Sequence, residues 1–195
     1  MELDNLIIDM CSLMSVTGYE TYDRAALLKL IGGSFDECRE DSVGNQVFVR
    51  RCGRPGAPRI LLDTHMDEIG LMVSEILEGG FVRVVNIGGV DTRILQTAEV
   101  IIYGNRPIHA VIASTPPHLQ KAGDSKKLPE VTELLVDTGY SRDELESIIR
   151  IGSPVGFVPK YLKLLGGHIA GKGLDDKSCA ACAAYAVMNA PTDRL

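Results

Sequence analysis

The amino-acid sequence predicts an α/β domain that is interrupted by an all-β insert. Helical spacing of apolar residues near the start, strand-like runs after it and an apolar helical pattern near the end indicate the α/β part. Between these segments, short β runs separated by Gly- and Pro-containing turns indicate a small barrel or sandwich. We therefore assign residues 1–67 and 163–195 to the α/β domain and residues 68–162 to the insert.

The first α/β segment begins with two predicted helices. Apolar residues recur at helical spacing over residues 3–14, and a second helix is expected over residues 19–31, where a glycine pair ends it. The strand-like runs 35–41 and 45–51 meet at a Gly-Asn pair that is typical of a hairpin. A third run, residues 59–65, is nearly all apolar, as expected for a strand buried on both faces.

The insert is predicted to contain six short strands and one helix. The helix is expected at residues 141–149, where Ser141 and Glu144 fit a capping box. A polar loop at residues 120–130 is expected to be exposed. The strand-like runs are residues 69–77, 80–87, 98–104, 108–114, 131–138 and 156–159.

The last part of the sequence predicts a strand, a glycine-rich loop and a buried helix. The strand is expected at residues 161–165, the loop at 166–173 and the helix at 175–190. The helix is rich in Ala, Cys and Met, which predicts close packing against a sheet.

Composition and charge argue against several classes of partner. The net charge of −6, with no offsetting Lys/Arg cluster, argues against nucleic-acid binding. The five cysteines are odd in number and scattered, which favours reduced thiols in a cytoplasmic protein over a disulfide framework. An acidic N-terminus and short apolar stretches give no sign of secretion or membrane insertion.

Two short motifs could bind metal ions. His65 and Asp67 would share one face of a strand end, so that the imidazole could ligate a divalent cation and the carboxylate could orient it. Asp175 and Asp176 precede the last helix, and one carboxylate can bridge two cations that are ~3.5–4 Å apart. Capping and helix-dipole roles are the alternatives for these aspartates. His and Asp ligands favour zinc, cobalt or manganese.

Four segments of the sequence resemble, in order, signature segments of the tetrahedral/glutamyl aminopeptidases, the dinuclear enzymes of metallopeptidase family forty-two. These segments are HMDEIGLMV, NIGGVD, ASTPPHLQK and GKGLDDK. The resemblance implies that His65 ligates one metal, that Asp175 bridges two divalent ions (zinc or cobalt), and that Asp67 is the catalytic-site carboxylate behind His65. It also implies a phosphorylase/hydrolase-like mixed-sheet catalytic domain and a dimerisation role for the insert.

By the same resemblance, the chain would belong to a metal-dependent aminopeptidase that acts on peptide substrates and self-associates into dimers and larger assemblies. The family's general-base Glu and its remaining ligands lie downstream of the LDD segment, and this chain ends before them. We therefore expect only part of the site, and little turnover from the chain alone. Lys177 stands where many members have Arg. A non-catalytic oligomerising or structural subunit with a degenerate metal site is the alternative.

Three weaker motifs complete the candidates. Residues 166–173 approach a phosphate-binding loop, but Gly173 occupies the Ser/Thr position that would hold magnesium. Cys179 and Cys182 form a CxxC pair for which we expect core packing. The remaining histidines are expected on a strand or on loops and are not assigned as ligands; they are His109, His118 and His168.

Overall fold

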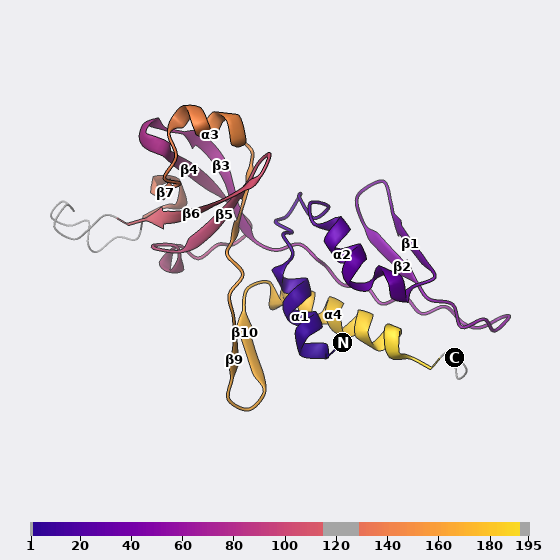
Figure 1. Cartoon of the computed structure of the whole chain (residues 1–195). Helices are drawn as coiled ribbons and strands as arrows, with labels where there is room; N and C mark the ends of the chain where they lie inside the picture. The colour runs from indigo at the N-terminus through magenta and orange to yellow at the C-terminus, as the bar shows by residue number, and fades with distance from the viewer. Residues whose placement is uncertain (1, 115–128, 192–195) are drawn as a thin grey trace. The chain divides into compact units, whose positions relative to one another are not determined.

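A computed structural model describes residues 2–114 and 129–191 (Figure 1). The chain divides into two compact units. One unit combines Met1–Glu68 with Pro159–Leu195, and the other is Ile69–Val158. His118 and most of the predicted polar loop at residues 120–130 lie outside the described residues. No helix in the described part of the chain is long and apolar enough to span a membrane.

The first unit is built on two helices that lie side by side, α1 (Leu3–Ser12) and α4 (Leu174–Asn189) (Figure 1). Alanines of α4 allow the helices to approach closely, because their side chains add little bulk between the two backbones. Helix α2 (Arg24–Ile31), followed by the 3₁₀ turn η1 (Gly32–Ser34), packs on the same core. The buried residues of this core are Leu6, Met10, Leu27, Ile31, Ala180, Ala181 and Ala184.

Two antiparallel hairpins belong to the same unit. Strands β1 (Glu37–Glu40) and β2 (Gln46–Val49) confirm the predicted Gly-Asn hairpin. Strands β9 (Tyr161–Leu164) and β10 (His168–Gly171) form the second hairpin, so the predicted loop at 166–173 is wrong. Gly166 and Gly167 both have positive φ and make the tight turn between these strands, because such a turn favours residues without a Cβ.

The strand predicted at residues 59–65 is not formed. Ile60, Leu61 and Leu62 are 78%, 84% and 53% exposed, and no described residue pairs with them in a sheet. An apolar run becomes a buried strand only where neighbouring strands and a covering layer are present. In this unit, the described strands pair only within the two hairpins.

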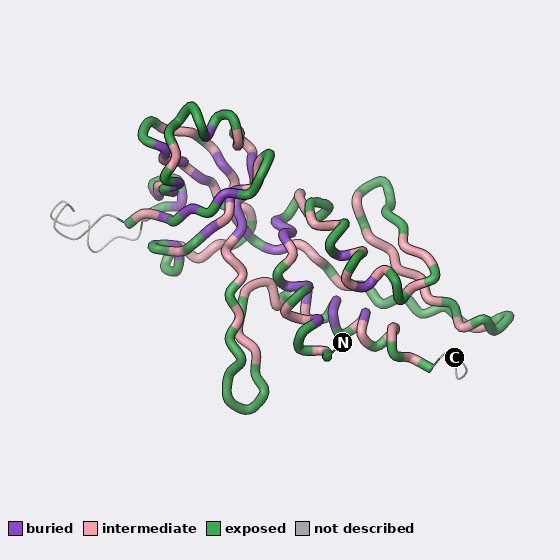
Figure 2. The backbone as a smooth tube through the Cα atoms, viewed as in Figure 1, coloured by how far each residue is buried: buried purple, intermediate pink, exposed green. Residues whose placement is uncertain are grey.

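The second unit is a closed six-stranded barrel in which every neighbouring pair is antiparallel. Buried and more exposed residues alternate along strand β6 (Pro107–Ala113), because successive side chains point to opposite faces. Figure 2 shows buried stretches in the barrel strands. The strand order is β3-β4-β7-β6-β5-β8. The strands are β3 (Gly70–Ile76), β4 (Phe81–Ile87), β5 (Glu99–Tyr103), β6 (Pro107–Ala113), β7 (Leu135–Asp137) and β8 (Pro154–Phe157).

The barrel has its own apolar core and is covered by helix α3 (Arg142–Ile148). The predicted capping box is present, with Ser141 and Glu144 each bonding the other's backbone N–H. Leu145 is fully buried and anchors the helix. The described part of the unit also contains the 3₁₀ turns η2 (Glu78–Gly80), η3 (Thr92–Ile94) and η6 (Val131–Glu133). The fold is therefore mixed α/β with a closed six-stranded barrel.

Candidate metal centre

The two motifs that the sequence singled out meet in the first unit. The Nδ1 atom of His65 lies 3.1 Å from Oδ1 of Asp67 and 3.2 Å from the carbonyl oxygen of the same residue. The opposite ring nitrogen, Nε2, lies 3.4 Å from Oδ1 of Asp175. His65 therefore has one nitrogen oriented by a carboxylate and the other directed at a second carboxylate from a distant part of the chain.

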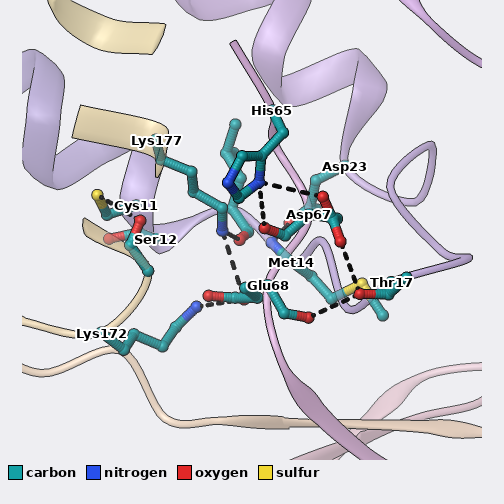
Figure 3. Close-up of polar contacts among 12 residues, drawn as sticks. Cys11, Ser12, Met14, Thr17, Asp23, His65, Asp67, Glu68, Lys172 and Lys177 are labelled. Carbon is teal, nitrogen blue, oxygen red and sulfur yellow. Dashed lines mark hydrogen bonds and ion pairs between the residues drawn. The ribbon is translucent and has the colours of Figure 1, made fainter. Parts of the chain in front are cut away.

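The segment that carries His65 is fixed by the segment that follows α1. Val16 and Glu68 form a parallel bridge, in which Thr17 N donates to Glu68 O and Glu68 N donates to Ser15 O. The Thr17 hydroxyl donates to Oδ2 of Asp67 at 2.7 Å, as Figure 3 shows. Sequence analysis assigned no role to Thr17.

The aspartate pair lies in an irregular first turn of α4. Gly173 precedes the helix in the left-handed region, and Asp175 has non-helical backbone angles. The side chain of Asp175 is 98% exposed. The carboxylate of Asp175 therefore extends toward His65 and solvent.

Charges around His65 favour a cation at this position. Burial lowers the pKa of His65, but the hydrogen bond to the Asp67 carbonyl and the charges of Asp67, Asp175 and Asp176 outweigh it and raise the pKa above its ordinary value. The three carboxylates that stabilise an imidazolium would equally stabilise a divalent ion beside a neutral imidazole.

His65 and Asp175 fit one metal ion. Two ligand atoms at ~2.1 Å from a tetrahedral zinc lie about 3.4 Å apart, and Nε2 and Oδ1 are separated by 3.4 Å. Asp67 on the other ring nitrogen matches the carboxylate–histidine–metal arrangement. Within the described residues, however, no three His, Cys, Asp or Glu side chains gather to hold a metal. The described chain thus offers two ligands of a site that requires more.

A buried charged cluster lies next to this centre. Oε1 of Glu68 accepts a hydrogen bond from Nζ of Lys172 at 2.7 Å and lies 3.3 Å from Nζ of Lys177. Burial lowers the pKa of Lys177 to about 8, against the opposing attraction of Glu68. Sequence analysis assigned no role to Glu68 or Lys172, and noted Lys177 only as a difference from the family.

Residues 44–194 match the family model described as M42 glutamyl aminopeptidase. The chain belongs to this family. It is 34% identical over 182 residues to the lysyl aminopeptidase of Pyrococcus furiosus, covering 90% of this chain and 50% of that protein.

Solved structures of M42-like peptidases agree with the fold. An aminopeptidase from Desulfurococcus kamchatkensis superposes with a TM-score of 0.82 at 33% identity, covering 95% of this chain and 51% of that one. For the TET1 peptidase of Pyrococcus horikoshii, which assembles into a tetrahedron or a large octahedral shell, the TM-score is 0.84 at 27% identity, with 97% and 56% covered. The chain spans about half the length of the curated relatives it matches.

In the described part of this M42 chain, the weaker motifs do not form sites. Residues 166–173 form a hairpin turn and a strand, and Lys172 pairs with Glu68, so the phosphate-loop alternative has no loop to enclose a phosphate. Cys179 and Cys182 are exposed, and the core-packing prediction for them is wrong because α4 buries its alanines instead. His109 and His168 lie exposed on strands β6 and β10.

Proposed function

We propose that this M42 chain supplies the first part of a two-metal aminopeptidase centre. In this proposal, His65 and Asp175 are metal ligands and Asp67 is the carboxylate that orients His65. The observation that carries it is the 3.4 Å separation of His65 Nε2 from Asp175 Oδ1, with Nδ1 of the same ring already held by Asp67.

The chain's own residues would prepare the site for two divalent ions, zinc or cobalt. When bound, such ions would acidify a water molecule and stabilise negative charge on the peptide carbonyl oxygen. Thr17 holds the Asp67 carboxylate, and Asp67 keeps the proton of His65 on Nδ1, so that the Nε2 lone pair is available. The exposed carboxylate of Asp175 has two oxygens with which it could bridge both ions.

The substrates would be peptides with a free N-terminus. This class follows from relatives named lysyl aminopeptidase and glutamyl aminopeptidase. We further propose that the first unit is part of a phosphorylase/hydrolase-like catalytic domain and that the protein is cytoplasmic. We also propose that it self-associates through the barrel unit into dimers and larger assemblies. The assembling TET1 peptidase supports the last point.

A non-catalytic subunit with a degenerate metal site is the second candidate. It is favoured by the two-ligand count, because a stable zinc site in a protein normally uses three or four protein ligands. Metal affinity distinguishes the two candidates. A catalytic half-site should bind metal through His65 and Asp175, whereas a degenerate site should not.

Metal titration of the purified chain tests the proposal. We expect cobalt binding that weakens about tenfold or more in His65→Gln and in Asp175→Asn, because each variant removes a proposed ligand. Asp63→Asn, which removes an equal charge from an exposed position on the same segment, should bind as the parent does. Unchanged affinity in both ligand variants would overturn the proposal.

An aminopeptidase assay on the same samples tests how complete the site is. We expect little release of N-terminal residues from chromogenic peptides by the 195-residue chain, because only two ligands converge in its described part. Robust cobalt-dependent release of N-terminal residues would contradict the proposal that this chain holds only part of the site.

A further inference from the structure

We propose that Glu68, Lys172 and Lys177 form a buried positioning triad that holds the His65 segment against the Asp175 turn. This inference deepens the proposed function and rests on it. The side-chain hydrogen bonds and ion pairs of the three residues join them to one another and to Leu13, not to His65 or Asp175, so they are positioning residues rather than catalytic ones.

The triad is buried and its charges are paired. The side chains of Lys177, Glu68 and Lys172 are 0%, 8% and 16% exposed. Both ammonium groups converge on Oε1 of Glu68, at 2.7 Å for Lys172 and 3.3 Å for Lys177, as Figure 3 shows. An isolated charge at such a depth would be strongly destabilised, so each lysine is constrained to remain where the carboxylate is.

The triad lies close in sequence to both proposed ligands, and its two lysines flank Asp175. Glu68 follows Asp67 directly and lies three residues after His65. Lys172 lies three residues before Asp175, and Lys177 lies two residues after it. The ion pairs therefore join the two segments on both sides of the aspartate pair.

The exposed contact between the ligands cannot hold these segments together by itself. His65 and Asp175 have side chains that are 53% and 98% exposed. Exposed ion pairs contribute little to stability, because water and salt screen them. The separation of the two ligand atoms must therefore be set by groups behind them that are shielded from solvent.

Further contacts fix the same turn. Lys177 donates to the carbonyl oxygen of Leu13 at 2.8 Å, which ties the start of α4 to the end of α1. Tyr161 donates to the carbonyl of Lys172, and Cys11 donates to the carbonyl of Gly173. A Cβ on Gly173 would lie 2.7 Å from Oε2 of Glu68. The turn and the Glu68 side chain are thus in direct contact.

Variants of Lys177 test the triad with two readouts. Lys177→Met keeps the length of the buried side chain but removes its charge, and Lys177→Arg restores a cation. In the folded Met variant we expect cobalt affinity to fall about tenfold or more, with a changed visible cobalt spectrum. We expect the Arg variant to recover both properties.

The second readout needs no metal. In Lys177→Met, the ring ¹⁵N signals of metal-free His65 should move toward those of Asp175→Asn, because either change removes the aspartate from the ring. Lys163→Met, on an exposed position of β9, should leave both the cobalt affinity and the ring signals unchanged. Lys172→Met, at a less buried site, should reproduce the effect if Lys177→Met does not fold.

The two proposals fail in different ways. A folded Lys177→Met variant with parental cobalt affinity and parental His65 signals would overturn the triad and leave the metal centre intact. Cobalt binding that is insensitive to His65→Gln would instead overturn the proposed function. In that case the metal-free ring signals would still decide whether the triad positions His65 against Asp175.

Discussion

At the scale of single residues, the candidate centre depends on side chains that each hold one atom of a neighbouring group in place. Asp67 is hydrogen-bonded through Oδ1 to Nδ1 of His65, and its Oδ2 accepts a hydrogen bond from the Thr17 hydroxyl. Asp175 faces the remaining ring nitrogen, Nε2. The carboxylates of Asp67, Asp175 and Asp176, which all act on the His65 ring, would repel one another without a cation. The same geometry that favours a metal is therefore a source of local instability in its absence.

Gly173 is a residue for which no substitution is neutral. Its φ of +65° lies in the left-handed region, and an added Cβ would approach Glu68 closely. Gly173→Ala should therefore lower the free energy of unfolding by about 1–3 kcal/mol, as measured by chemical denaturation. Gly33→Ala is the matched control, since Gly33 has neither a positive φ nor an atom within 4 Å of an added Cβ. Equal denaturation midpoints for the two variants would contradict the argument.

The sequence identified the candidate ligands but not the residues that support them. His65, Asp67 and Asp175 stand in short strings whose residue types already indicate metal chemistry. Glu68 and Lys172 are 104 positions apart, and a pairing at that distance leaves no trace in local spacing. The burial of Lys177 could not be predicted either, because a lysine with no known partner of opposite charge is expected to be exposed.

At the scale of elements, helix α3 shows how a local sequence signal can specify a structure. The Ser141 N–H and hydroxyl donate to the carboxylate of Glu144, and both groups lie within one turn. These hydrogen bonds lower the pKa of Glu144, the side-chain hydroxyl of Ser141 contributing most. The capping box needs no distant partner, and sequence analysis therefore identified it correctly.

The capping box should make the stability of the chain depend on pH. Because the pKa of Glu144 is lower in the folded state, its contribution is present above the ordinary Glu range and is lost as pH falls through the folded value. Glu144→Gln should thus destabilise the barrel at pH 7 more than Asp143→Asn, which removes an equal first-turn charge. Thermal unfolding from pH 7 to pH 3 should show this difference shrink. A difference that persists at pH 3 would count against the assignment.

Strands were predicted well where apolar and polar residues alternate between turns, and poorly where that pattern is absent. The β1–β2 hairpin and the barrel strands follow from period-two patterns between turns. Strand β10 was missed, because its glycine-rich sequence has the composition of a loop. The run at residues 59–65 was predicted as a strand but does not form one. Its composition is that of a buried strand, but no described neighbour pairs with it.

At the scale of the whole molecule, each compact unit has a core of its own. The barrel core is made mainly of strand residues, together with five residues outside the strands, namely Leu95, Val131, Leu134, Leu145 and Ile149. The core of the first unit is made of residues from helices α1, α2 and α4. All proposed metal-centre residues lie in the first unit. The chain thus separates the proposed chemistry from the barrel, for which we propose the role of self-association.

The barrel should fold without the rest of the chain. Strands β3 and β8 are antiparallel neighbours, with Leu71 opposite Val155, so the two ends of residues 69–158 emerge beside each other. Closure leaves no unpaired sheet edge, and the apolar core lies inside. A polypeptide of residues 69–158 should therefore show a β-type circular dichroism spectrum and cooperative thermal unfolding. Val136→Asp, which buries a charge in that core, should abolish the transition. Gradual, non-cooperative melting of the parent fragment would show instead that the barrel depends on the first unit for its stability.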